Sequence, residues 1–394
     1  MNAKNSFLAV SLLFSAQFSI PAWALDDGAT FSTLILTPLT IEGLTNDNFG
    51  NLYTPGRTPG AGLPCPVWRV NIANPSLVLV GNIPAPSPTG QCSPSGLAFN
   101  RAGRLFVTET DKIYSFTPNA GAPPLATVFA SGVPGTNGLA FDRDGNLWTG
   151  DGTTGQGRVW KITSSGVVTE MFRVQPMANE VNLVAGVGGI GRDVRSLPPG
   201  ALTVTPTSRN AQNTLGSQPL VANGLQFDSH DNLLIADTAR GAIWKVKFSH
   251  HGELKSRTGC DTTFTANTLC LENILVAHPL LEGVDGFVLD KDDNIWADPN
   301  ERNAIVFVSD KGKVSEVFRN DPDLVTQLRN GGPLETPTSP ALSDRRLCTA
   351  NSDGNRRDNF PNTAGQINPA GPNRGKISCM DQRVKTRGAT LPVR

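Results

Sequence analysis

The chain lacks an excess of charge of either sign. Of its 394 residues, 34 are Lys or Arg and 34 are Asp or Glu, so the formal net charge at pH 7 is zero. Without a basic surplus there is no electrostatic reason to expect binding to nucleic acid or to an anionic membrane. Only 17% of residues are charged, whereas 40 are Gly and 30 are Pro, a composition that suits many short strands joined by turns.

Motifs of several other protein classes are also missing. No C-x-x-C spacing occurs, so a zinc ribbon or a thioredoxin-like site is not expected. No G-x-S-x-G sequence is present, which removes the usual sign of a serine hydrolase. Residues 186–191 fit G-x-G-x-x-G, but Pro198 and Pro199 follow and no helical period appears, so we interpret them as a loop rather than a dinucleotide site.

After the first 24 residues the chain has no apolar run long enough to cross a bilayer as a helix. The N-terminal segment itself carries Lys4, an apolar core at residues 7–14 and an A-x-A cleavage pattern at residues 22–24. We therefore predict that residues 1–24 are a cleaved secretory signal and that the mature protein is secreted or periplasmic. A buried N-terminal strand and an uncleaved anchor are the alternatives.

All the cysteines lie after this segment. They are Cys65, Cys92, Cys260, Cys270, Cys348 and Cys379. An even number in an exported protein indicates disulfides, although six cysteines allow fifteen pairings. We favour pairing between sequence neighbours, 65–92, 260–270 and 348–379, because each bond would then staple one repeat or its flanking loop.

One short pattern returns along the chain. Its copies are Glu42-Gly43-Leu44, Ser95-Gly96-Leu97, Asn137-Gly138-Leu139, Asn223-Gly224-Leu225 and Asp285-Gly286-Phe287, with a degenerate copy at Ser339-Pro340. Each copy opens an apolar stretch of period two, then a turn, then a second apolar stretch, as in NGLAFDRDGNLW at residues 137–148. Period two indicates strands, and Asp-Gly or Asp-Asn between them indicates a hairpin. A repeat made of hairpins is typical of a β-propeller.

The spacing of the copies predicts the domain organisation. The glycines fall at 43, 96, 138, 224 and 286, and most gaps match one four-stranded blade. We therefore predict an all-β, six-bladed propeller with four-stranded antiparallel blades around a central channel. It would occupy residues 25–350, with an insertion near 173–219 that is either a lid or a surface loop, and a C-terminal extension at 351–394. The strand-like residues 29–39 could complete the last blade and close the ring.

The residue before each glycine of the repeat has an oxygen atom in its side chain. Because the first strand of a propeller blade lines the central channel, these side chains should form one ring: Glu42, Ser95, Asn137, Asn223, Asp285 and Ser339. Two carboxylates and two carboxamides that converge in a channel need a compensating partner, and a hard cation such as Ca²⁺ is suited to oxygen ligands. Alternatively, these residues cap turns or bond neighbouring strands and bind nothing.

The chain resembles the six-bladed propeller hydrolases of the senescence-marker-protein/gluconolactonase family, which is related to diisopropylfluorophosphatase and the paraoxonases. The resemblance covers residues 40–350 and is carried best by VDGFVLDKDDNIWAD at 284–298. Members hold a divalent cation, usually calcium, with a Glu from the first blade, Asn from central blades and an Asp from a later blade. Glu42, Asn137, Asn223 and Asp285 match that set in identity and order.

The resemblance implies hydrolysis of a small-molecule lactone or a related ester by a monomer. The divalent cation, with Ca²⁺ expected first, would polarise the reacting oxygen. Asp285 would be the catalytic base or nucleophile, with a metal-bound water as the alternative, and Ser95 and Ser339 would contact substrate. No histidine matches the catalytic histidines of the paraoxonase branch. The rival hypothesis is a non-catalytic NHL-type propeller that binds a partner; a third is a purely structural cation.

Overall fold

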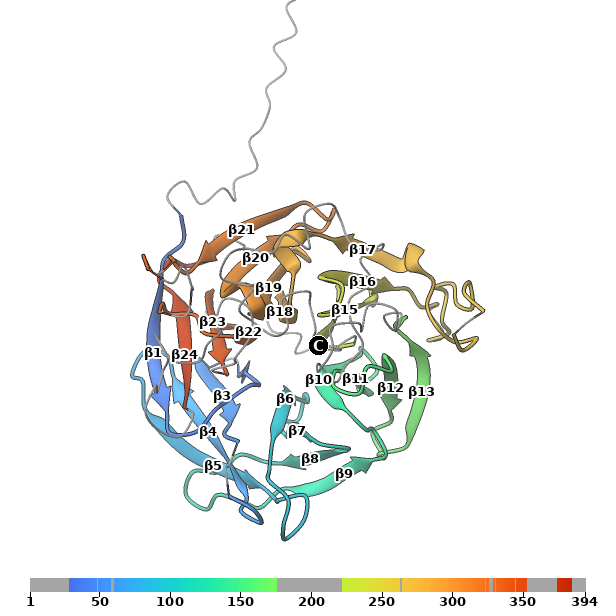
Figure 1. Ribbon diagram of the computed structural model, residues 1–394. Helices are drawn as coiled ribbons and strands as arrows, with labels where there is room; N and C mark the ends of the chain where they lie inside the picture. Colours follow the sequence, from blue (N-terminus) through green and yellow to red (C-terminus); the bar gives the residue numbers. More distant parts are fainter. Residues whose placement is uncertain are drawn as a thin grey trace, which may run out of the picture.

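Six four-stranded antiparallel sheets surround a common axis in the computed structural model, each one a blade (Figure 1). The predicted six-bladed β-propeller is therefore confirmed. The structure describes residues 28–47, 49–57, 60–175, 222–262, 264–322, 324–325, 329, 331–343, 345–352 and 374–384. The predicted signal at 1–24 and most of the predicted insertion, residues 176–219, lie outside this part of the chain.

The first three blades follow the chain from the axis outwards. Blade one comprises β2 (Thr45–Asn46), β3 (Asn51–Pro55), β4 (Cys65–Asn71) and β5 (Leu77–Ile83). Blade two comprises β6 (Pro94–Phe99), β7 (Leu105–Glu109), β8 (Lys112–Phe116) and β9 (Thr127–Ser131). Blade three comprises β10 (Thr136–Phe141), β11 (Leu147–Asp151), β12 (Arg158–Ile162) and β13 (Val168–Arg173).

The fourth and fifth blades have the same order and carry the short 3₁₀ helices. Blade four comprises β14 (Leu225–Phe227), β15 (Leu233–Asp237), β16 (Ala242–Val246) and β17 (Ile274–Ala277). Blade five comprises β18 (Val284–Leu289), β19 (Ile295–Pro299), β20 (Ala304–Val308) and β21 (Val314–Arg319). The 3₁₀ helices are η4 (Leu271–Asn273), η5 (Pro279–Leu281) and η6 (Asn300–Arg302).

The sixth blade closes the ring with the two ends of the chain. Its strand order is β1 (Phe31–Thr37), β24 (Gly375–Met380), β23 (Arg346–Asn351) and β22 (Pro337–Ser343), with β22 innermost. The expected closing role of residues 29–39 is confirmed, since β1 pairs with β24. The predicted C-terminal extension at 351–394 is wrong in part, because β24 is an integral strand of this blade. The sequence repeat did not reveal it because β24 contributes neither the glycine nor the hairpin turn.

An Asp side chain fixes the hairpin turn of the repeat in blades one, three, four and five, and Asn100 does so in blade two. In blade three, the Asp142 carboxylate accepts hydrogen bonds from the backbone N–H of Asn146 at 2.8 Å and from the Trp148 indole at 2.9 Å. In blade five, Asp290 accepts from the Trp296 indole at 3.1 Å. The carboxylate thus joins the turn to the second strand, and it satisfies an indole N–H that packing would otherwise bury without a partner.

Apolar side chains fill the space between neighbouring blades. Trp148 and Phe172 of blade three pack with Leu233 and Trp244 of blade four in one buried cluster. Burial of each such large side chain contributes about 1.5–3 kcal/mol. Trp148 is therefore part of the core between the blades.

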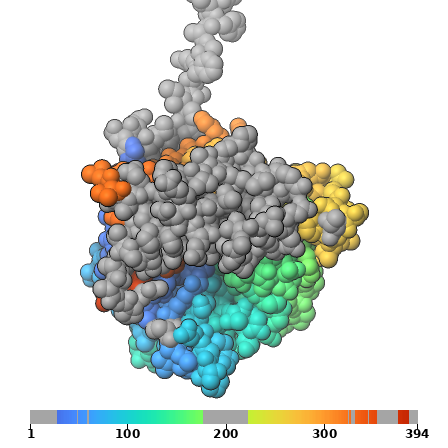
Figure 2. All heavy atoms as spheres, in the orientation of Figure 1, coloured from blue at the N-terminus to red at the C-terminus, as the bar shows by residue number. Residues whose placement is uncertain are grey.

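The predicted disulfides are all present. Cys65–Cys92, Cys260–Cys270 and Cys348–Cys379 are bonded. The last of these joins β23 to β24 within the closing blade. Cys260–Cys270 ties the long segment between β16 and β17, which stands out from the rim of the propeller (yellow in Figure 2). Within the described residues, no helix has the length and apolar character needed to span a membrane.

Candidate functional site

Backbone packing places the ring residues in one register. The glycine of each copy lies against the carbonyl of the ring residue in the next blade. A Cβ added at Gly96, Gly138 or Gly224 would lie 2.1, 2.7 or 2.7 Å from the carbonyl oxygen of Asn137, Asn223 or Asp285 respectively. Only glycine allows inner strands to approach this closely. The glycines of the repeat therefore bring the oxygen-bearing side chains together around the axis.

We predict that Gly96→Ala destabilises the propeller by about 3 kcal/mol, because both the new methyl group and the carbonyl that it meets belong to packed inner strands. Gly121→Ala is the matched control, since a Cβ there meets only the Asn119 side chain at 3.5 Å. Chemical denaturation of both variants tests this prediction. Equal denaturation midpoints for Gly96→Ala and Gly121→Ala would show that the inner strands can move apart without a loss of stability.

The sixth blade differs from the sequence prediction by one residue. Pro340 pairs with Thr349 as Leu97 pairs with Val107 in blade two, so Pro340 occupies the leucine register and not the glycine register. A Cβ at Gly286 would accordingly meet the Thr338 carbonyl oxygen at 2.4 Å. Thr338 therefore occupies the ring register and Ser339 the glycine register. The degenerate copy has no glycine to mark the register, and only strand pairing reveals it.

A second set of residues, which the sequence analysis missed, supports the ring. In blades four and five the member lies one residue beyond the second strand; in blade one it follows Gly56, which pairs with Ile41 just beyond β3. The Thr238 hydroxyl accepts from Asn223 Nδ2 at 3.0 Å, and Asn300 Nδ2 donates to Asp285 Oδ2 at 2.9 Å. In blade one the corresponding side chain is Arg57, which forms an ion pair with Glu42. A constant spacing of fifteen residues is the sequence signal for these pairs.

Arg57 connects several members of the ring. Besides its ion pair with Glu42, its guanidinium donates to Ser95 Oγ at 3.3 Å and to the Pro94 carbonyl at 3.4 Å. Burial lowers the pKa of Arg57 to about 10, and the negative charges of Asp285 and Glu109 oppose that shift. Arg57 therefore remains charged at neutral pH and places one positive charge among the ring oxygens.

Asn137 reaches across the axis because its own blade leaves room for it. The residue fifteen positions later is Gly152, where a Cβ would lie 2.6 Å from the Asn137 Cβ. With no supporting side chain in blade three, Asn137 Nδ2 donates instead to Glu42 Oε1 at 3.3 Å. Residues from the first and third blades are thus in direct contact.

Asp285 and Asn223 form the other half of the ring. Burial raises the pKa of Asp285 to about 7, against the opposing effects of hydrogen bonds from Asn300 and Asn223 and of the charge of Arg57. The side-chain oxygen of Asn223 is buried and has no hydrogen-bond partner within the described part of the chain. A buried acceptor without a donor is costly unless another group satisfies it.

The ring has the chemistry that a hard cation requires. Glu42, Asn137, Asn223 and Asp285 offer two carboxylates and two amides, and Asn223 Oδ1 is a buried acceptor without a donor among the residues that the structure describes. Calcium accepts such a mixed oxygen set in flexible geometry. The described residues contain no group of three or more His, Cys, Asp or Glu side chains arranged for a metal ion. The ring residues include neither His nor Cys, which are the usual ligands of zinc. The predicted ligands therefore fit calcium, with Arg57 as an unexpected neighbour.

A second buried acid lies near the ring. The Asp298 carboxylate accepts from the Thr349 hydroxyl, and its Oδ1 has no hydrogen-bond partner among the residues the structure describes. Burial raises the pKa of Asp298 well above its ordinary value, and the negative charge of Asp285 adds to this effect. Asp298 therefore favours the native state when protonated and opposes it when ionised.

Asp298 should give the protein a pH-dependent stability. Because its folded-state pKa is raised, its stabilising contribution is complete below about pH 4 and is lost as the pH rises through the folded-state pKa. We expect Asp298→Asn to raise the melting temperature at pH 8 by several degrees and to change it little at pH 4, because a protonated carboxyl resembles an amide. Thermal unfolding at the two pH values measures the difference. An equal change in melting temperature at pH 4 and pH 8 would mean that the charge of Asp298 does not cause the change in stability.

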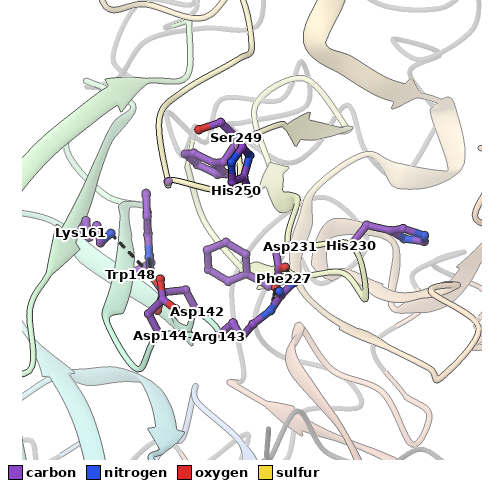
Figure 3. Close-up of a pocket in the computed structure, with 12 residues that line it drawn as sticks. Asp142, Arg143, Asp144, Trp148, Lys161, Phe227, His230, Asp231, Ser249 and His250 are labelled. Carbon is purple, nitrogen blue, oxygen red and sulfur yellow. Dashed lines mark hydrogen bonds and ion pairs between the residues drawn. The ribbon is translucent and has the colours of Figure 1, made fainter.

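A pocket of about 320 Å³ lies between the third and fourth blades (Figure 3). It lies at the hairpin-turn ends of the inner strands, opposite the ring, with Trp148 and Phe227 among its lining residues. Its charged groups pair with each other: Arg143 with Asp231, and Lys161 Nζ with Asp142 at 3.9 Å. None of the predicted site residues lines this pocket.

Comparison with known proteins agrees with this architecture. Residues 177–335 match the model of the family described as "SMP-30/Gluconolactonase/LRE-like region". No curated protein matches the chain. A luciferin-regenerating enzyme has 12% sequence identity and a TM-score of 0.53, with 92% of this chain and 99% of that chain covered.

Two further solved structures have the same fold. The calcium-binding protein regucalcin from Agrobacterium tumefaciens has 16% identity and a TM-score of 0.53, with 93% of this chain and 97% of that chain covered. The PQQ-bound aldose sugar dehydrogenase from Streptomyces coelicolor has 14% identity and a TM-score of 0.53, with 89% and 98% covered. At these identities the likenesses establish the fold alone. The predicted resemblance is confirmed by the family match, since residues 177–335 are similar to the SMP-30/gluconolactonase/LRE-like family.

Proposed function

We propose that the protein is an exported hydrolase of lactones or related esters that uses a calcium-type cation at the ring. The observation that carries the proposal is the convergence of Glu42, Asn137, Asn223 and Asp285, with Asn223 Oδ1 buried and lacking a donor. The family match at residues 177–335 supports a hydrolase of this class. When bound, the cation would polarise the reacting carbonyl and stabilise the developing negative charge.

The residues of the chain have distinct roles in this proposal. Glu42, Asn137 and Asn223 would hold the cation through their side-chain oxygens. Asp285 would share in binding and act as the base or nucleophile at the reacting carbon. Asn300 keeps Asp285 in place through its 2.9 Å hydrogen bond to Oδ2. Burial of the inner strands excludes water from the polar groups that do not take part.

The export proposal rests on separate observations. The N-terminal sequence has the three parts of a secretory signal, and the three disulfides suit an oxidising compartment. We therefore propose secretion or a periplasmic location, with a mature chain that begins near residue 25.

The proposal is tested by measuring acid release from a panel of lactones and aryl esters in a pH-stat, with the mature protein and added Ca²⁺. We expect turnover of at least one lactone, loss of turnover in EDTA and recovery on addition of Ca²⁺. Failure across the panel with Ca²⁺ demonstrably bound would contradict the hydrolase assignment and favour a structural cation.

One observation favours a non-catalytic binding propeller of NHL type as the second candidate. Arg57 already neutralises Glu42, so the ring can be satisfied in part without a metal. In that case neither Ca²⁺ nor EDTA would alter the melting temperature, and the protein would show no turnover.

A further inference from the structure

One position of the supporting set differs in charge from the other five. The residues that follow the second strands are Arg57, Thr110, Gly152, Thr238, Asn300 and Ser352. Arg57 alone carries a charge. The Thr238 and Asn300 side chains hold ring residues through neutral hydrogen bonds, whereas Arg57 holds Glu42 through an ion pair. Blade one therefore places the positively charged side chain of Arg57 beside the same ring oxygens that could bind a metal cation.

The contacts of the Arg57 guanidinium show which negative charges its own charge offsets. It contacts Glu42 and Ser95 Oγ, and it lies close enough to Asp285 and Glu109 to be influenced by both carboxylates. Its charge offsets negative charge that the low-dielectric axis would otherwise leave uncompensated. The same charge repels any divalent cation that approaches the same oxygens.

We propose that Arg57 is a tethered cation that neutralises Glu42 in the metal-free protein and competes with the divalent cation for it, so that Arg57 sets the calcium affinity of the ring. This inference rests on the proposed function only in assuming a cation at the ring. It does not require that any particular substrate be turned over. Arg57 is a positioning residue here, because it acts through Glu42 and not on a reacting atom.

The alternative role for Arg57 predicts the opposite change in affinity. If Arg57 merely orients Glu42 for the metal, as outer-shell partners of ligands often do, its removal should weaken metal binding by about 10- to 100-fold. If it competes, its removal should strengthen binding, because a positive charge beside the ligands has been removed. Calcium affinity measured without substrate therefore separates the two roles.

The test compares wild type with Arg57→Gln, which keeps a hydrogen-bonding side chain but has no charge, and with Arg57→Lys, which keeps the charge but lacks the planar fork. Arg158→Gln is the matched control. Arg158 begins the third strand of blade three and also pairs with an acid, Asp151, at 3.0 Å, and its other hydrogen bonds go to Thr154 and the Pro134 carbonyl rather than to a ring residue. Calcium affinity is measured by isothermal titration calorimetry, and the metal-free melting temperature is measured in EDTA.

We expect Arg57→Gln to bind Ca²⁺ at least about tenfold more tightly than wild type and to melt at a lower temperature in EDTA, because Glu42 loses its compensating charge. Arg57→Lys should bind with an affinity between those two proteins, and Arg158→Gln should match wild type. If Arg57→Gln does not fold, Arg57→Lys must still bind more tightly than wild type.

Weaker or unchanged calcium binding by the Arg57 variants would overturn the inference and leave the proposed function standing. Absence of Ca²⁺ binding in every protein, wild type included, would overturn both, because no cation would be there to compete. Calcium binding with the predicted order of affinities but without hydrolysis would keep the inference and contradict only the proposed function.

Discussion

Asp285→Asn is expected to lower kcat/KM for the best lactone or ester by at least about 10³-fold, which corresponds to about 4 kcal/mol of transition-state stabilisation. The substitution keeps the shape of the side chain and its place beside Asn300 and Asn223. It removes the charge needed both for cation binding and for attack or proton transfer. Steady-state kinetics at saturating Ca²⁺ measures the loss.

Asp298→Asn is the control for this prediction. Asp298 is also a fully buried acid of blade five, but it lies on the second strand and contacts the Thr349 hydroxyl rather than a ring residue. Its kcat/KM at pH 8 should stay within about threefold of wild type, because no reacting group depends on it directly. If Asp285→Asn keeps a tenth or more of the activity, Asp285 is neither base nor nucleophile, and a metal-bound water becomes the better candidate.

Removal of the closing strand is expected to abolish folding. A chain that begins at residue 38 lacks β1 and leaves β24 as an unpaired edge in the closing blade. It also loses Phe31, which packs against Phe318 of blade five with 5.0 Å between ring centroids. We expect the free energy of unfolding to fall by at least about 5 kcal/mol, comparable to the net stability of many domains.

A chain that begins at residue 28 is the control, since it keeps all of β1. Circular dichroism and thermal unfolding of the two truncated proteins measure the difference. A cooperative transition within a few degrees of the control in the shorter chain would contradict the role of β1 in closing the propeller.

The repeat in the sequence was enough to predict the blades and most of the ring. Alternating strands and hairpin turns are local features, and the residue before each glycine is fixed by strand register in five blades. The disulfide pairing followed in the same way, because neighbouring cysteines such as Cys348 and Cys379 flank adjacent strands. In each case the prediction depends only on residues that are near one another in the sequence.

The features that were missed depend on contacts between distant residues. Thr338 replaces Ser339 at the ring because the pairing of Pro340 with Thr349 fixes the register, and no local pattern marks it. Arg57 was missed because its role appears only when the end of one strand is placed beside the start of another. Strand β24 was missed because it contains neither the glycine nor the hairpin turn of the repeat, and its pairing with β23 and β1 appears only in the structure.

The most direct test of the central claim is a calcium titration of the purified, EDTA-treated protein, with melting temperature and hydrolysis of a lactone recorded on the same samples. We predict that both rise together and saturate at the same Ca²⁺ concentration, because one ion at Glu42, Asn137, Asn223 and Asp285 would serve both. A melting temperature and a rate that do not respond to Ca²⁺ would contradict the metal-dependent hydrolase and leave the ring neutralised by Arg57 alone.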